Sequence, residues 1–157
     1  MYRLLLVASL AAVAAGCGAR SQPPPFKAVV DNALLGDAVH EPAAVHIWNA
    51  VGTTITASGI EEIAPKTDQE WTRLRNSAVV ITEGANLLMM APRALNNDDW
   101  MKMSLALVDA GEAARQAAEA KDPDKLLEAG GIIYGVCNDC HTKYEGAAIQ
   151  TNPQTNQ

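Results

Sequence analysis

The sequence predicts a single all-α domain, built as an up-down-up-down four-helix bundle. Of its 157 residues, 48% are hydrophobic but only 4% are aromatic, a balance that suits packed helices. Four segments carry apolar residues at alternating spacings of three and four, and no segment alternates with a period of two over the length of a strand. Short links join the second, third and fourth segments, which favours antiparallel neighbours.

The first two helices are predicted from their apolar faces. Pro42 suits the first turn of the first helix, or a kink if that helix begins earlier, so its start stays open. The second helix begins at Thr67, which forms a capping box with Glu70, and it ends before Pro92. The expected buried faces are Ala44, Ile47, Trp48, Val51 and Ile55 in the first helix, and Trp71, Leu74, Ala78, Ile81, Ala85 and Leu88 in the second.

The third and fourth helices also have recognisable beginnings. Asn97, Asp98 and Asp99 place capping and acidic groups where the positive end of the third helix should lie. Asp122 followed by Pro123 opens the fourth helix. The expected buried stripes are Trp100, Ser104, Leu107, Gly111, Ala114 and Ala118 in the third helix, and Leu126, Gly130, Ile133, Cys137, Cys140 and Tyr144 in the fourth.

The N-terminal residues are predicted to direct export. Arg3 precedes an apolar stretch, Leu4 to Ala15, that is too short to span a bilayer. The run from Val13 to Cys17 resembles the lipobox of bacterial lipoproteins, in which the cysteine is lipidated and becomes the first mature residue. Ordinary cleavage nearby is the alternative. We therefore expect a periplasmic protein of a bacterium, anchored to a membrane through a lipid on Cys17.

The chain divides accordingly into four parts. Three consecutive prolines, Pro23 to Pro25, favour an extended segment between the anchor and the domain. The C-terminal residues are rich in Asn, Gln and Thr, which predicts disorder. The expected parts are a signal peptide at 1–16, an anchor and tether at 17–30, a helical domain at 31–146 and a tail at 147–157.

The cysteines carry the most specific signal. Three cysteines are an odd number for an exported chain, but lipidation of Cys17 would leave the pair Cys137 and Cys140. The residues from Cys137 to His141 read CNDCH, the spacing of c-type haem attachment. Two thiols add to the haem vinyl groups, and the histidine supplies a strong-field nitrogen ligand. The motif predicts one covalent haem c per chain, with His141 as its proximal axial ligand.

The cysteine pair has three other interpretations. A thioredoxin-like redox pair would stand at the start of a helix that follows a strand, whereas this pair lies near the end of a helix. A zinc site would need a further ligand, and the only other histidines are His40 and His46. A structural disulfide is also compatible with an oxidising compartment. Haem attachment remains the favoured interpretation.

A four-helix bundle with CxxCH near its C-terminus resembles the class II c-type cytochromes, the cytochrome c′ group. The resemblance covers roughly Asp31 to Gly146 and is strong at the CxxCH motif and at the aromatic Tyr144. Many members follow that aromatic residue with Arg, whereas Glu145 stands here, so the role of that Arg is not carried over. The resemblance implies haem binding, electron transfer and, in some members, binding of small gases.

Bundle geometry predicts the surroundings of the haem. In up-down-up-down order, the end of the fourth helix lies beside the starts of the first and third and the end of the second. Extending the apolar face of the first helix back one turn reaches His40, whereas His46 falls on the opposite face. His40 is therefore the candidate distal axial ligand, with a methionine or an open site as alternatives. The expected pocket residues are Met89, Met90, Trp100, Met101 and Tyr144.

The predicted function is electron transfer in the cell envelope, with a redox protein as partner and no enzymatic activity. The formal net charge of −6 argues against nucleic acid as a partner, and a homodimer is left open. One alternative is a five-coordinate haem protein that binds nitric oxide or carbon monoxide. A second alternative is a helical interaction module without haem. Coordination of the iron would separate the first two, and haem content would identify the third.

Overall fold

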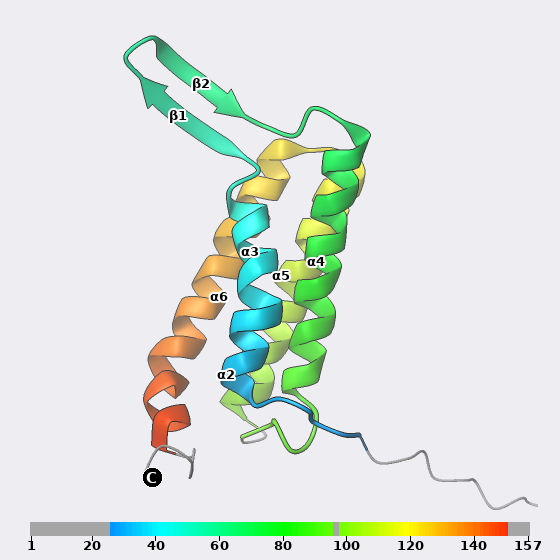
Figure 1. Cartoon of the computed structure of the whole chain (residues 1–157), viewed down its shortest axis with the longest axis vertical. Helices are drawn as coiled ribbons and strands as arrows, with labels where there is room; N and C mark the ends of the chain where they lie inside the picture. The colour runs from blue at the N-terminus through cyan, green and yellow to red at the C-terminus, as the bar shows by residue number, and fades with distance from the viewer. Residues whose placement is uncertain (1–25, 96–97, 151–157) are drawn as a thin grey trace, which may run out of the picture.

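The computed structural model of the chain describes residues 26–95 and 98–150, with side chains as far as Tyr144. The described part is mostly helical and includes one small two-stranded sheet (Figure 1). A helical fold is thus confirmed, although the chain is not purely α. The predicted signal peptide, Cys17 and the tether as far as residue 25 lie outside the described residues, as do residues 151–157.

The first helical stretch begins earlier than Pro42 and is continuous. It runs through α2 (Asn32–Leu35), the π-helical turn η1 (Gly36–His40) and α3 (Glu41–Trp48). At the end of η1, the Glu41 N–H donates to the Gly36 carbonyl five residues earlier. Proline has no N–H and its ring crowds the carbonyl four residues before it, so a wider turn at this point accommodates Pro42.

The prediction that the chain contains no strand is wrong. β1 (Gly52–Thr56) and β2 (Gly59–Ile63) pair as an antiparallel hairpin, which projects from one end of the helices in Figure 1. The sequence pattern extended the first helix to Ile55, but α3 ends at Trp48 and Ile55 is 82% exposed. Gly52 has a φ of 151°, and the four residues after it are β-branched, which favours a strand over further helix.

Three longer helices complete the fold: α4 (Asp68–Leu88), α5 (Asp99–Ala120) and α6 (Pro123–Gln150). α4 packs on α5, α5 packs on α6, and α3 contacts both α4 and α6, so each of these four helices has two neighbours. The predicted stripes of α4 and α5 are buried, except that Leu88 is half-buried. α6 includes residues 147–150, which the sequence assigned to the tail. The largest fully buried side chains are Ile47, Leu74, Ile81, Leu126 and Ile133.

α4 begins with the predicted capping box. The Glu70 N–H donates to Thr67 Oγ1 at 3.2 Å, and Glu70 Oε2 accepts from the Thr67 N–H at 2.8 Å. The Lys66 N–H donates to the same carboxylate oxygen at 2.7 Å. These bonds satisfy backbone donors that have no partner within the helix, which is why the start of α4 could be located from the sequence.

Replacement of either side chain of the capping box is expected to destabilise α4. Thr67→Ala should lower the free energy of unfolding by about 1 kcal/mol, measured by urea denaturation at neutral pH. The backbone amides of Lys66 and Thr67 lower the pKa of Glu70, so its stabilisation is present above the ordinary value and is lost as pH falls through the lowered one. Glu70→Gln should therefore lose less stability on acidification than the wild type. Equal losses would contradict this account.

Candidate functional site

The C-terminal half of α6 carries the CxxCH motif, at residues 137–141. Cys137 and Cys140 are half-buried, free thiols about one helical turn apart, and Tyr144 continues the same face. Burial raises the pKa of both thiols, so both are protonated at neutral pH. His141 is exposed beside them. Two half-buried thiols and one exposed imidazole therefore occupy a short stretch of one helix.

Aromatic and ionic contacts hold this end of α6 against the start of α5. The rings of Trp100 and Tyr144 meet edge to face with centroids 5.0 Å apart, and Trp100 Nε1 donates to the Leu88 carbonyl at 2.7 Å. Lys143 forms an ion pair with Asp99, and its ammonium lies 5.9 Å from the centre of the Tyr144 ring. The end of α4, the start of α5 and the end of α6 are thus linked, and the predicted pocket residues Trp100 and Tyr144 are in contact.

His40 lies at the same end of the fold, in η1. Its side chain is only 9% exposed and its Nε2 makes no hydrogen bond. The ring lies against Gly84 of α4, where an added Cβ would stand 2.4 Å from Nε2. Burial lowers the pKa of His40, the Gly84 backbone opposes that shift, and the charge of His141 adds to it. At neutral pH His40 is therefore a neutral, buried imidazole within electrostatic range of His141.

The other predicted residues occupy less specific positions. Met89 and Met90 are half-buried just after α4, and Met101 is half-buried in the first turn of α5. His46 is exposed, as its place on the opposite face of the first helix predicted, and its Nδ1 lies 2.8 Å from Ser77 Oγ. His40 and His46 thus belong to one helix but to different environments, which makes His46 a matched control.

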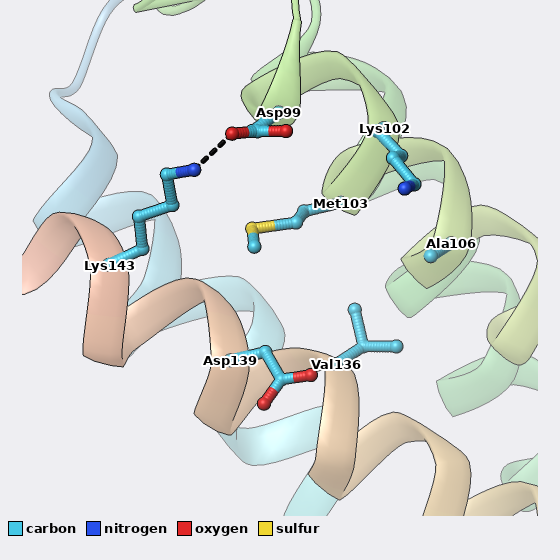
Figure 2. A pocket seen from close by; sticks show the side chains of 7 residues that line it. All are labelled: Asp99, Lys102, Met103, Ala106, Val136, Asp139 and Lys143. Carbon is cyan, nitrogen blue, oxygen red and sulfur yellow. Dashed lines mark hydrogen bonds and ion pairs between the residues drawn. The ribbon is translucent and has the colours of Figure 1, made fainter.

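A cavity of about 310 Å³ lies between α5 and α6 (Figure 2). Figure 2 shows the Met103 side chain reaching between the two helices, with the Asp99–Lys143 ion pair at one end. This cavity was not predicted from the sequence, although its residues recur at spacings of three and four on two facing helices. They are Asp99, Lys102, Met103, Ala106, Val136, Asp139 and Lys143.

Comparison of the chain with protein-family models, with curated proteins and with solved structures finds no match. The resemblance to the class II c-type cytochromes therefore remains a prediction that depends on the CxxCH motif and on Tyr144.

The residues available as metal ligands bear on what the site can hold. Among the described residues, no group of three or more His, Cys, Asp or Glu side chains is arranged to hold a metal ion. A haem iron differs from a zinc ion in this respect, because the macrocycle supplies four ligands and the protein only one or two.

In the part of the chain that the structure describes, no helix is long and apolar enough to cross a membrane.

Proposed function

We propose that the protein is a mono-haem c-type cytochrome that transfers electrons in the bacterial cell envelope. In this proposal haem is attached to Cys137 and Cys140, and His141 is its proximal ligand. The observation that supports this most directly is that two free, half-buried thiols lie one turn apart in α6, beside an exposed imidazole. Covalent attachment needs two thiols and a nitrogen ligand in this spacing.

The environment of His40 supports the same proposal. Buried polar side chains normally have a hydrogen-bond partner, and Nε2 of His40 has none. The neutral form, which burial of the ring favours, is the form of imidazole that binds a metal. If haem were bound at the CxxCH motif of α6, Nε2 of His40 would be available as its distal axial ligand. Because the ring now lies against Gly84, that role requires the side chain to turn.

The proposal includes the arrangement of the helices, an up-down-up-down bundle with haem at the end of the fourth helix. The contacts of α3 with α4 and α6, and of α5 with α4 and α6, support this arrangement. The β-hairpin is an addition to the plan. In Figure 1 it lies at the end of the helices opposite the C-terminal end of α6, away from the proposed haem.

Haem, when bound, would supply a one-electron iron couple. The residues of the chain would hold it and limit its exposure to water: Trp100 and Tyr144 form an aromatic contact beside the thiols, and Lys143 with Asp99 fastens the end of α6. The net negative charge of the chain favours a basic or neutral redox protein as partner. We propose no enzymatic activity.

Gas binding is the second candidate, because the His40 ring lies against Gly84 of α4. Absorption spectra of the oxidised and reduced protein separate the two candidates. A six-coordinate low-spin iron favours electron transfer, and an open high-spin iron favours binding of carbon monoxide or nitric oxide. A pyridine haemochrome assay tests the common premise of one haem per chain. A folded protein that never acquires haem would favour the helical interaction module instead.

Anchoring to a membrane is proposed to depend on Cys17, which follows the lipobox-like run that begins at Val13. Cys17→Ser is expected to abolish labelling with a radioactive or alkyne fatty acid, and to leave a soluble or unprocessed protein. The measurement is membrane fractionation together with mass spectrometry of the N-terminus. An unlipidated mature N-terminus beyond residue 17 in the wild type would refute the anchor and leave only export.

A further inference from the structure

The β-hairpin packs little against the helices. In Figure 1 it projects from one end of them, and the main contacts of β1 and β2 are with each other. Its turn is held internally, because Thr56 Oγ1 donates to the Gly59 carbonyl at 3.1 Å and accepts from the Ser58 N–H at 3.3 Å. A two-stranded ribbon without a packed face is only marginally stable in water, whereas sheets of three or more strands are stable. The hairpin therefore gains stability from a further strand that joins it.

The two outer edges of the hairpin differ in charge. Among the described residues the sheet has two strands only, so each strand has one edge without a neighbour. Unpaired N–H and C=O groups on such an edge can pair with a strand of another chain. β2 carries Glu61 and Glu62, and charged side chains on an edge strand hinder such pairing. β1 reads GTTIT, with no charge and no proline, so its edge is open to a further strand.

The edge of β1 is complementary to itself. Full antiparallel overlap of two copies places a two-fold axis at Thr54, which then lies opposite Thr54 of the second copy, while Thr53 lies opposite Ile55. Threonine pairs are favourable across strands, and no like charges meet. Within one hairpin Ile55 pairs with Ile60, and these side chains are 82% and 72% exposed. In the overlap the two copies of Ile55 are diagonal neighbours on one face, so four isoleucines form a continuous apolar row.

Electrostatic repulsion also favours the β1 edge over the β2 edge as the contact between two copies. Neighbouring strands lie about 5 Å apart, so pairing through β2 would bring the glutamates of both copies side by side. Pairing through β1 separates the two β2 strands by three strand spacings, about 14 Å. That distance exceeds the Debye length of about 8 Å at physiological ionic strength, so the repulsion between Glu61 and Glu62 of the two copies is largely screened.

From this geometry we propose that the β1 edge joins two copies of the chain in a two-fold symmetric, four-stranded antiparallel sheet with the order β2–β1–β1–β2. Each copy contributes one five-residue strand. This contact is smaller than the roughly 1,200–2,000 Å² buried in stable complexes, so the association is reversible and depends on concentration. In Figure 1 the hairpin lies opposite the C-terminal end of α6, so the contact is remote from the CxxCH motif. The inference is independent of haem binding.

The first test compares disulfide formation by Thr54→Cys and Glu61→Cys in the full chain. Residues 54 and 61 lie directly opposite each other in the hairpin and are both exposed, which makes them a matched pair. The two-fold axis brings residue 54 of both copies to a Cα separation of about 5 Å, which a disulfide spans. Residue 61 of the two copies would be about 14 Å apart, which no disulfide spans. Both variants keep the three native cysteines, which therefore contribute equally.

Under mild oxidation, covalent dimers of Thr54→Cys should form about tenfold faster than those of Glu61→Cys, because only the first pair meets the distance limit of a disulfide. The measurement is non-reducing electrophoresis against time. Equal rates for the two variants would overturn the inference.

The second test is sedimentation equilibrium of the wild type, Thr54→Lys and Glu61→Lys. The wild type should show a monomer–dimer equilibrium. Thr54→Lys places two ammonium groups at the two-fold axis and should weaken association about fivefold. Within its own hairpin the new lysine faces Glu61, an opposite-charge pair that keeps the hairpin formed. Glu61→Lys changes the charge of the other edge and should leave the dimer intact, and both variants should keep the thermal midpoint of the helices.

Two results of sedimentation would also overturn the inference. One is a wild-type chain that stays monomeric up to about 1 mM, where even weak contacts populate dimers; the β1 edge would then be left to a strand of a different protein. The other is a dimer that Thr54→Lys leaves intact, because the contact would then lie elsewhere. Haem content, measured on the same samples, reports separately on the proposed function, so a dimer without haem would support this inference while refuting that function.

Discussion

Cys137→Ala and Cys140→Ala are each expected to weaken or abolish covalent capture of haem, and His141→Ala to destroy the native absorption spectrum. Each thiol would form one thioether bond, so loss of either sulfur removes one of the two links. Both thiols are half-buried and Cys137 packs against the hydrophobic core, which would place the macrocycle against the helices. Wild-type protein expressed with a haem-ligation system should be red and should keep its colour in acid acetone, which extracts haem that is not covalently bound.

Cys17→Ser provides the matched control for these cysteine variants. It removes the third thiol of the chain but leaves both thiols of the CxxCH motif. Its haem content per folded chain should therefore equal that of the wild type, even if its export or anchoring changes. A wild-type protein that remains colourless under the same conditions would rule out the cytochrome interpretation. Equal haem content in all cysteine variants would rule out covalent attachment.

The helices that could be predicted have local signals that tertiary structure does not override. α4 shows this best: Thr67 and Glu70 form the capping box that their spacing predicts, and the residues after them bury one face. α5 likewise buries the stripe that begins at Trp100. In α4, capping and apolar periodicity point to the same start. In α5 the Asp98 side chain makes no capping hydrogen bond, so the apolar periodicity that begins at Trp100 is the signal that located this helix.

The hairpin was missed because period-two alternation reveals a strand only when one of its faces is buried. Ile55 and Ile60 pair across the two strands, yet they are 82% and 72% exposed. A β-ribbon that projects into solvent on both sides has no apolar alternation to detect. Gly52, Gly59 and the β-branched run between them favour a hairpin. The apolar spacing of the first helix, however, also continues as far as Ile55, and this favoured a longer helix over a strand.

At the candidate site, positions on a single helix were predictable and contacts between helices were not. His40 is buried, as extension of the apolar face from Ala44 predicted, although the π-turn in η1 was not foreseen. The close approach of Gly84 to that ring depends on how α4 packs on the first helical stretch. A glycine inside a helix signals such an approach only weakly, and its spacing does not identify the neighbour.

The largest effect expected at the distal side is that of His40→Ala. If the wild-type iron is six-coordinate through His40, loss of the imidazole should convert the spectrum towards five-coordinate high-spin and open the site to carbon monoxide. The reason is that two strong-field axial nitrogens pair the electrons of the iron, whereas one does not. The buried, neutral imidazole with an unpaired Nε2 is suited to this role. The measurements are absorption spectra with and without carbon monoxide.

His46→Ala is the control, because His46 belongs to the same helical stretch but is exposed, and its Nδ1 contacts Ser77. It should change neither the spin state nor the affinity for carbon monoxide. A low-spin spectrum that persists in His40→Ala would exclude His40 as the ligand and direct attention to Met89 and Met90, which follow α4. A wild-type protein that is already high-spin at neutral pH would favour gas binding over electron transfer, since the distal position would then be open before any substitution.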